Sequence, residues 1–207
     1  MAAVGLLLAA GACAAPASFQ VSTVASGLHH PWDGAFTPDG SFVYTERVGR
    51  IGVLRSGTRR TLATPSDVVA KGEGGMLGLD VDPDFATNRR IYTCFVSNEG
   101  GLGARVARWT VSSDWTSLNG RKDLLSGIDV NTSGRHSGCR VKVGPDGALW
   151  ITTGDAAKGT NPQDPNSLAG KVLRITTDGG PAAGNADGIW RGEIYAAGFR
   201  NPQGLAF

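Results

Sequence analysis

Three short motifs carry the side chains most able to do chemistry together: Arg135-His136-Ser137, Gly154-Asp155 and Arg200-Asn201-Pro202-Gln203. A neutral imidazole accepts a proton near neutral pH, and a carboxylate beside it fixes its tautomer and stabilises the imidazolium. Arg200 presents a flat fork of permanently charged donors, which suits an oxygen that acquires negative charge. Together these groups are suited to taking hydrogen from an alcohol.

Removing hydrogen from an alcohol moves a hydride as well as a proton, and no side chain accepts a hydride. This chemistry therefore requires a cofactor. The sequence has no Gly-x-Gly-x-x-Gly turn between a strand and a helix, so it carries no signal of a nicotinamide site. Each residue also has an ordinary interpretation: His136 as a solvated loop residue, Asp155 as part of an Asx turn, and Arg200 as a structural cation bonded to backbone carbonyls.

A repeated pattern of short strands must position these motifs. Gly34-Ala35-Phe36-Thr37-Pro38-Asp39-Gly40 precedes an apolar run, and similar segments begin near residues 79, 141 and 204. Pro presets the φ angle of the first turn position and Gly tolerates the left-handed one, so each copy predicts a tight turn between two strands. The second copy, Pro83-Asp84-Phe85, is expected to turn in the same way. Equivalent positions lie 45, 62 and 64 residues apart: Phe36, Val81, Val143 and Phe207.

The repeat predicts an all-β fold, a β-propeller. Further strands are expected at residues 51–54, 105–109 and 171–175, and no stretch keeps a helical period. A period near the ~40 to 50 residues of a four-stranded blade favours a propeller over a sandwich. A propeller needs about 4 to 8 blades, whereas this sequence supplies about three and the first strand of another. We therefore expect a truncated part of a longer protein. Residues 19–24 alternate apolar and polar, which predicts a half-buried strand.

The N-terminus has the features of an export signal. Residues 1–17 contain no charged side chain, and their apolar core is shorter than the ~20 residues of a membrane span. The small residues before Cys13 resemble the lipobox of bacterial lipoproteins, in which the cysteine carries the lipid. Ordinary cleavage near Ala15 is the alternative. We expect a signal over residues 1–17, a partial propeller over residues 18–207, and either a lipid anchor at the cell surface or a secreted or periplasmic protein.

The expected export affects how the three cysteines are interpreted, because disulfides form in oxidising compartments outside the cytoplasm. If Cys13 carries lipid, Cys94 and Cys139 remain on predicted strands of neighbouring blades, and a disulfide between them is expected, with two buried free thiols as the alternative. The 20 Lys and Arg residues are balanced by 18 Asp and Glu residues without charge runs. This pattern does not favour nucleic acid as a partner and leaves a small molecule as the expected one.

A set of motifs, in order and with compatible spacing from Trp32 to the last residue, resembles the soluble sugar dehydrogenases that depend on pyrroloquinoline quinone, the glucose/sorbosone dehydrogenase family. The motifs are Trp32-Asp33, Thr45-Glu46-Arg47, Glu73-Gly74-Gly75-Met76-Leu77-Gly78, Arg135-His136-Ser137-Gly138, Gly154-Asp155 and Gly198-Phe199-Arg200-Asn201-Pro202-Gln203-Gly204.

The resemblance implies a six-bladed propeller that oxidises an aldose at its anomeric carbon to the lactone, with hydride transfer to the quinone and an external electron acceptor. By motif position, His136 is similar to the catalytic base, Asp155 to the carboxylate beside it, and Arg200 and Asn201 to the pair that contacts the quinone. Glu73 stands where some members have a cofactor-binding Gln, and a carboxylate there would repel an anionic quinone unless a cation intervened. The family's Ca²⁺ ligands are expected beyond Phe207.

Two other functions fit parts of the sequence. A propeller lactonase or other hydrolase would use a metal ion at the axis to activate water, and Glu73 and Asp155 are its only plausible ligands here. A non-catalytic carbohydrate-binding propeller would keep the repeats but would not require His136, Asp155 and Arg200 together. The presence of all three favours the oxidoreductase.

Overall fold

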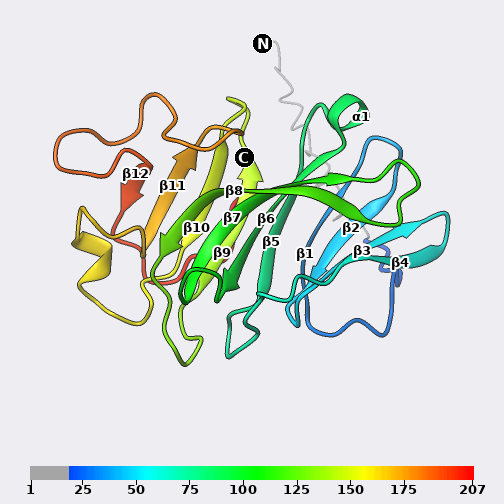
Figure 1. The fold of residues 1–207 in the computed structure, drawn as a ribbon, viewed down its shortest axis with the longest axis horizontal. Coiled ribbons are helices and arrows are strands. Elements are labelled where there is room, and N and C mark those ends of the chain that lie inside the picture. Colours follow the sequence, from blue (N-terminus) through cyan, green and yellow to red (C-terminus); the bar gives the residue numbers. More distant parts are fainter. Residues whose placement is uncertain (1–18) are drawn as a thin grey trace, which may run out of the picture.

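The computed structural model describes residues 19–207, which form three four-stranded antiparallel sheets. In each sheet the strands follow one another in chain order (Figure 1). The first contains β1 (Pro31–Phe36), β2 (Phe42–Glu46), β3 (Arg50–Arg55) and β4 (Thr58–Ala63). The second contains β5 (Met76–Val81), β6 (Arg90–Ser97), β7 (Gly103–Val111) and β8 (Leu118–Ile128). The third contains β9 (Gly138–Val143), β10 (Leu149–Thr153), β11 (Lys171–Ile175) and β12 (Ile194–Ala197).

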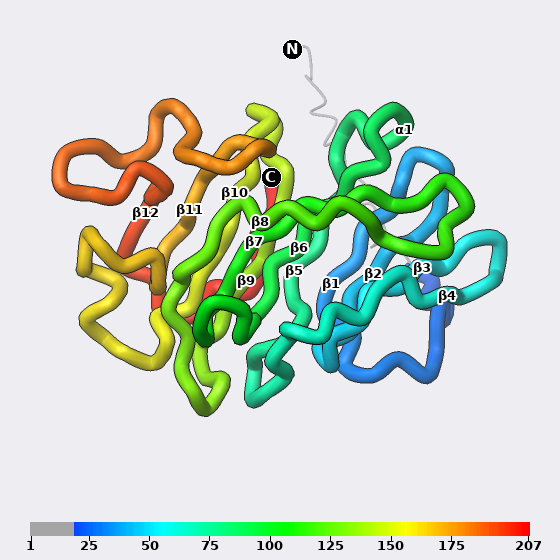
Figure 2. Tube along the Cα trace, in the orientation of Figure 1, coloured from blue at the N-terminus to red at the C-terminus, as the bar shows by residue number. Residues whose placement is uncertain are grey.

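These sheets are three consecutive blades of a propeller, so the expected all-β propeller fold is confirmed. Among the first strands of the three blades, β5 contacts both β1 and β9, and each blade extends outward from its first strand (Figures 1 and 2). Phe36, Val81 and Val143, the positions taken as equivalent in the repeat, are the last residues of β1, β5 and β9. The sequence period is therefore the period of the blades.

A tight turn forms in all three described copies of the motif, as predicted, and in one copy the chain continues from the turn into a helix. Gly40 and Gly147 adopt left-handed φ angles of 79° and 75° in the Pro-Asp-Gly turns. The second copy forms its predicted tight turn, in which the N–H of Phe85 donates to the carbonyl of Asp82 at 3.0 Å, but the chain then continues into the single-turn helix α1 (Phe85–Asn88). Phe85 replaces the turn glycine, and its buried ring packs 5.7 Å from that of Trp115. Burial of this ring stabilises the helical continuation, which does not need the left-handed glycine of the other two copies.

The strand predicted over residues 19–24 is wrong. This segment has no strand hydrogen bonding, and Phe19 and Val21 are 91% and 97% exposed. A strand needs a neighbour to satisfy its backbone groups, and no described strand pairs with these residues. The predicted signal over residues 1–17 and the predicted lipid-bearing Cys13 lie outside the described residues. Within residues 19–207, no helix has the length and apolar character to cross a bilayer.

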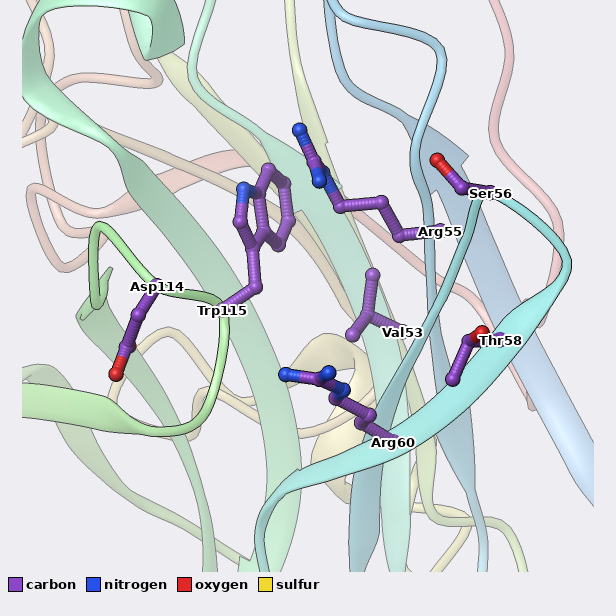
Figure 3. Close-up of a pocket in the computed structure, with 7 residues that line it drawn as sticks. All are labelled: Val53, Arg55, Ser56, Thr58, Arg60, Asp114 and Trp115. Atoms are coloured by element: carbon purple, nitrogen blue, oxygen red, sulfur yellow. The ribbon is translucent and has the colours of Figure 1, made fainter.

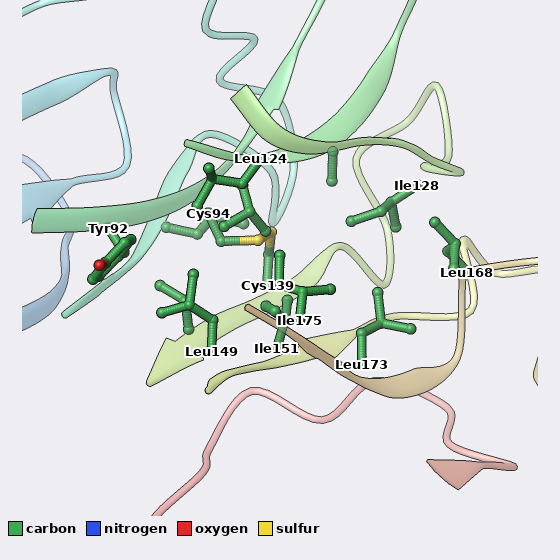
Figure 4. Close-up of a cluster of buried hydrophobic side chains, with 14 of the residues drawn as sticks. Tyr92, Cys94, Leu124, Ile128, Cys139, Leu149, Ile151, Leu168, Leu173 and Ile175 are labelled. Atoms are coloured by element: carbon green, nitrogen blue, oxygen red, sulfur yellow. A yellow bond between two sulfur atoms is a disulfide. The ribbon is translucent and has the colours of Figure 1, made fainter. Parts of the chain in front are cut away.

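The apolar faces of neighbouring blades form two buried clusters. One joins the first and second blades through Val43, Ile51, Met76 and Phe95. The other joins the second and third blades, and the disulfide between Cys94 of β6 and Cys139 of β9 lies within it (Figure 4). Both cysteines are fully buried, and their Cα atoms are 5.5 Å apart. The side chains expected to pair are thus paired, and the bond ties β9, which follows the His136 loop, to the second blade.

Candidate active site

A buried histidine–aspartate pair lies where the loop before β9 meets the loop after β10. His136 Nδ1 is 2.7 Å from Asp155 Oδ1, and the two residues are only 7% and 6% exposed. With the carboxylate accepting the proton of Nδ1–H, neutral His136 keeps the lone pair of Nε2. No residue within 19–207 hydrogen-bonds to Nε2. The pair therefore offers an oriented base.

Asp155 is fixed by further bonds on both its side chain and its backbone. Its Oδ1 also accepts the N–H of Ala157 at 2.7 Å, while its own N–H donates to the carbonyl of Arg200 at 2.7 Å. The side chain of Asn161, in the 3₁₀ turn η1 (Asn161–Gln163), donates to the carbonyl of Asp155 at 3.1 Å. These bonds fix the carboxylate in one orientation. A group that positions an imidazole must be fixed in this way.

The backbone around the pair is strained. His136, Cys139, Ala156 and Ala157 have φ angles of 54°, 87°, 57° and 54°, in the left-handed region that non-glycine residues avoid. Each such residue costs on the order of 1–3 kcal/mol and persists only where its surroundings impose it. Half of the eight non-glycine residues with positive φ within 19–207 gather at this site. Such clustering is typical of functional sites.

Two glycines let the loops approach closely. A side chain on Gly154 would collide with the carbonyl oxygen of His136, and one on Gly138 would collide with the amide of Gly154. The loops carrying the base and its carboxylate therefore pack backbone against backbone. Gly138 also donates its N–H to Asn201 Oδ1 at 3.0 Å, which brings the segment after β12 to the same place.

Arg200 and Asn201 enter the site in different ways. The guanidinium of Arg200 is exposed and forms no ion pair or hydrogen bond with another residue of the described chain. Its backbone carbonyl is the group that holds Asp155. Asn201 is half-buried, and its Nδ2 donates to Glu73 Oε2 at 2.7 Å. Asn201 is thus fixed by the protein, while the charge of Arg200 is available to a ligand.

Glu73, in the loop before β5, completes the group. Its Oε2 accepts hydrogen bonds from the backbone N–H of His136 at 3.1 Å and from the amides of Asn201 and Gln203 at 2.7 and 3.4 Å. The structure therefore brings four of the side chains singled out in the sequence together, those of Glu73, His136, Asp155 and Asn201, and Arg200 joins them through its backbone carbonyl only. They come from loops separated by up to 128 residues.

Sequence reasoning missed the support behind Asp155. Lys171, the first residue of β11, is fully buried, and its ammonium donates to the carbonyls of Asn161 and Ala169 at 2.5 and 3.0 Å. Burial lowers the pKa of Lys171, and nearby Asp164 opposes this effect. The sequence pattern predicts Lys171 only as part of a strand, and the one signal of an interior role is that this lysine adjoins an apolar run.

An open groove of about 390 Å³ lies next to the loops that carry the pair. Its lining includes Asp129, Asn131, Thr132, Ala157 and Lys158. Asn131 donates to the carbonyl of Ala156 at 3.0 Å, so the groove is bounded by the same two loops that carry His136 and Asp155. Carboxylate, amide, hydroxyl and ammonium groups in one groove suit a polyhydroxylated ligand.

A second pocket, of about 250 Å³, lies between the rims of the first and second blades (Figure 3). Arg55 and Arg60 from the first blade face Asp114 and Trp115 from the loop after β7. Arg55 and Arg89 stack on the ring of Trp115, with guanidinium carbons 5.6 and 4.8 Å from its centre. This pocket shares no residue with the histidine–aspartate site. In the part of the chain that the structure describes, no three His, Cys, Asp or Glu side chains cluster as a metal site would require.

Known proteins are similar to this chain in both sequence and fold. Aldose sugar dehydrogenase YliI of Escherichia coli K12 is 32% identical over 211 residues, covering 97% of this chain and 56% of the relative. Quinoprotein glucose dehydrogenase B of Acinetobacter calcoaceticus is 30% identical over 225 residues, covering 92% and 46%. The PQQ-bound structure of aldose sugar dehydrogenase from Streptomyces coelicolor superposes with a TM-score of 0.80 at 33% identity, covering 87% of this chain and 54% of the other.

The chain spans about half the length of the curated relatives it matches. The family model for glucose/sorbosone dehydrogenases matches residues 28–207, which includes all three blades and every residue of the site. The chain belongs to the glucose/sorbosone dehydrogenase family.

Proposed function

We propose that the intact protein is a sugar dehydrogenase that oxidises the C1 hydroxyl of an aldose to the lactone and delivers the hydride to pyrroloquinoline quinone. The observation that carries this proposal is the 2.7 Å hydrogen bond between Nδ1 of His136 and Oδ1 of Asp155, two buried groups in the loops next to β9 and β10. The relatives named as aldose sugar and glucose dehydrogenases support sugar oxidation, and the PQQ-bound relative supports the cofactor.

The donor set of the site fits an anionic quinone. The exposed guanidinium of Arg200 has no carboxylate partner within residues 19–207 and suits a carboxylate or a quinone oxygen. Asn201 has one amide hydrogen engaged by Glu73 and one left to donate. Arg200 and Asn201 would therefore hold the cofactor beside His136, and the cofactor supplies the hydride acceptor that no side chain provides. Calcium, which the family resemblance implies, would be bound by residues other than these.

The proton chemistry belongs to the chain itself. Nε2 of His136 accepts the proton of the C1 hydroxyl as the hydride leaves the same carbon, and general bases contribute about 10² to 10⁴ to a rate. Asp155 holds the tautomer that leaves Nε2 basic and stabilises the imidazolium that forms. The low exposure of both groups keeps water from competing for the proton. The groove lined by Asp129 and Lys158 would hold the hydroxyls of the sugar.

We further propose an exported protein, because the uncharged apolar segment before Cys13 has the composition of a secretory signal. An exported dehydrogenase passes its electrons to an external acceptor, and lipid on Cys13 would anchor it to a membrane.

Reconstitution of the intact protein tests the proposal. Apo-protein supplied with pyrroloquinoline quinone and Ca²⁺ should reduce an artificial dye when an aldose is added, without NAD, and omission of the quinone should abolish the signal. Protein that shows no quinone-dependent oxidation but opens lactones would contradict the proposal and support the hydrolase alternative.

A further inference from the structure

The carboxylate of Glu73 gathers donors from two separate segments onto one oxygen. Oε2 accepts from the backbone N–H of His136 and from the side-chain amides of Asn201 and Gln203. Lys and Arg side chains of the described chain form no ion pair with Glu73. The charge is therefore satisfied by neutral N–H groups of the site itself, which a carboxylate accepts strongly.

Glu73 also holds the turn that carries the base. Its own N–H donates to the carbonyl of Gly134 at 2.9 Å, while its side chain accepts from the N–H of His136. The two bonds bracket the turn on both sides of Arg135. A side chain on Gly134 would collide with the carbonyl of Lys71, so the loops before β5 and β9 are in direct backbone contact. This bracket helps to impose the left-handed φ of 54° at His136.

Asn201 is fixed at both ends of its amide. Nδ2 donates to Glu73 and Oδ1 accepts from the N–H of Gly138, so a single amide orientation satisfies both partners. Without an acceptor at residue 73, the amide keeps only one bond and gains rotational freedom. The hydrogen that Asn201 offers to a ligand would then have no fixed direction.

Resting on the function proposed above, we propose that Glu73 is a positioning residue that acts through Asn201 and His136. Its acceptor oxygen holds one ligand donor and the backbone of the base in place, and it works by hydrogen bonding rather than by contact with the reacting atoms. In this role Oε2 is turned to protein donors and is not left free to face an anionic quinone.

Four variants of the intact protein test this role: Glu73→Gln, Glu73→Ala, Asn201→Ala and the Glu73→Ala/Asn201→Ala double variant. Glu73→Gln keeps an acceptor and should leave quinone affinity and kcat within about threefold of wild type. Glu73→Ala should weaken both by about tenfold or more, as expected for loss of hydrogen bonds to a charged acceptor. The loss of quinone affinity in the double variant should be smaller than the product of the two single losses, because both substitutions remove the same arrangement. Asp187→Ala, at an exposed carboxylate of the third blade, is the matched control.

Two results would overturn the role: Glu73→Gln as damaging as Glu73→Ala, or losses in quinone affinity that multiply in the double variant. Hydrogen exchange of the His136 amide in the apo-protein gives a readout that needs no cofactor. Exchange should be about tenfold faster in Glu73→Ala and unchanged in Glu73→Gln. If wild-type protein binds no quinone, the proposed function fails, while this exchange pattern still decides whether Glu73 holds the base. Unchanged exchange in Glu73→Ala refutes that role.

Discussion

Removal of the disulfide between Cys94 and Cys139 should destabilise the protein by a loop-closure effect. The bridge spans 45 residues of sequence, which contain β7 and β8, and it joins the second blade to the first strand of the third. Closing a loop of this size in the unfolded chain corresponds to about 4 kcal/mol at 25 °C. Both cysteines are fully buried, so their replacement by Ala also removes packed sulfur atoms.

The assay is urea unfolding of three forms of the intact protein: oxidised wild type, wild type reduced with dithiothreitol, and the Cys94→Ala/Cys139→Ala variant. Reduction keeps the side-chain volume and isolates the effect of the cross-link, and both reduced and variant forms should unfold at lower urea. Non-reducing mass analysis of the intact protein should show two hydrogens fewer than after reduction. A difference in unfolding free energy below about 1 kcal/mol between oxidised and reduced protein would refute the loop-closure reasoning. Two alkylatable thiols in freshly isolated protein would refute the bridge itself.

Three further predictions concern the site and the second blade. Arg200→Ala should weaken quinone binding and lower kcat together, because it removes both a hydrogen-bond donor and a charge. Arg60→Ala, at the distant pocket, should change neither quantity. Unchanged quinone affinity in Arg200→Ala would contradict this prediction. Gly154→Ala should lower kcat by up to about 10²-fold, because the added carbon collides with the His136 carbonyl and displaces Asp155. Gly159→Ala, where the added carbon has open space, should leave kcat unchanged. Equal kcat values for the two variants would contradict this prediction. Burial raises the pKa of Asp67, but hydrogen bonds from Arg121 and Ser97 outweigh it and hold the pKa below its usual value. A carboxyl group with a depressed pKa stabilises the fold at pH values above its unfolded pKa of about 3.9, and this stabilisation is lost as the pH falls through its folded pKa. Asp67→Asn should therefore be less stable than wild type at pH 7, and the difference in unfolding free energy should disappear below about pH 4. A difference that stays constant with pH would contradict this prediction.

The first and third strands of each blade were predictable from local sequence signals. β1, β5 and β9 carry the repeated turn motif, and the predicted runs at residues 51–54, 105–109 and 171–175 fall on β3, β7 and β11. The outer strands were not recognised, because β4 and β8 are largely exposed and polar, as Thr58–Ala63 illustrates. Segment 19–24 has the alternation of a strand but no described partner, and strand formation requires one.

The site was predictable in its members but not in its connections. The motifs placed His136 and Asp155 at the ends of repeats, and the propeller brings such ends to one mouth. The hydrogen bond from Asn201 to Glu73 spans 128 residues, and the buried ammonium of Lys171 acts through the backbone of Asn161. Contacts of this kind depend on loop conformations with left-handed residues such as Ala156 and Ala157, which propensity disfavours and only the folded surroundings impose.

The most direct test of the central claim is the rate of cofactor reduction by a saturating aldose in a single turnover of the reconstituted intact protein, measured by stopped-flow absorbance for wild type and His136→Ala. The account predicts that quinone still binds to the variant and that its reduction is slower by about 10² to 10⁴, the contribution of a general base. Reduction of bound quinone by His136→Ala at near wild-type rate would contradict the assignment of His136 as the base that Asp155 orients.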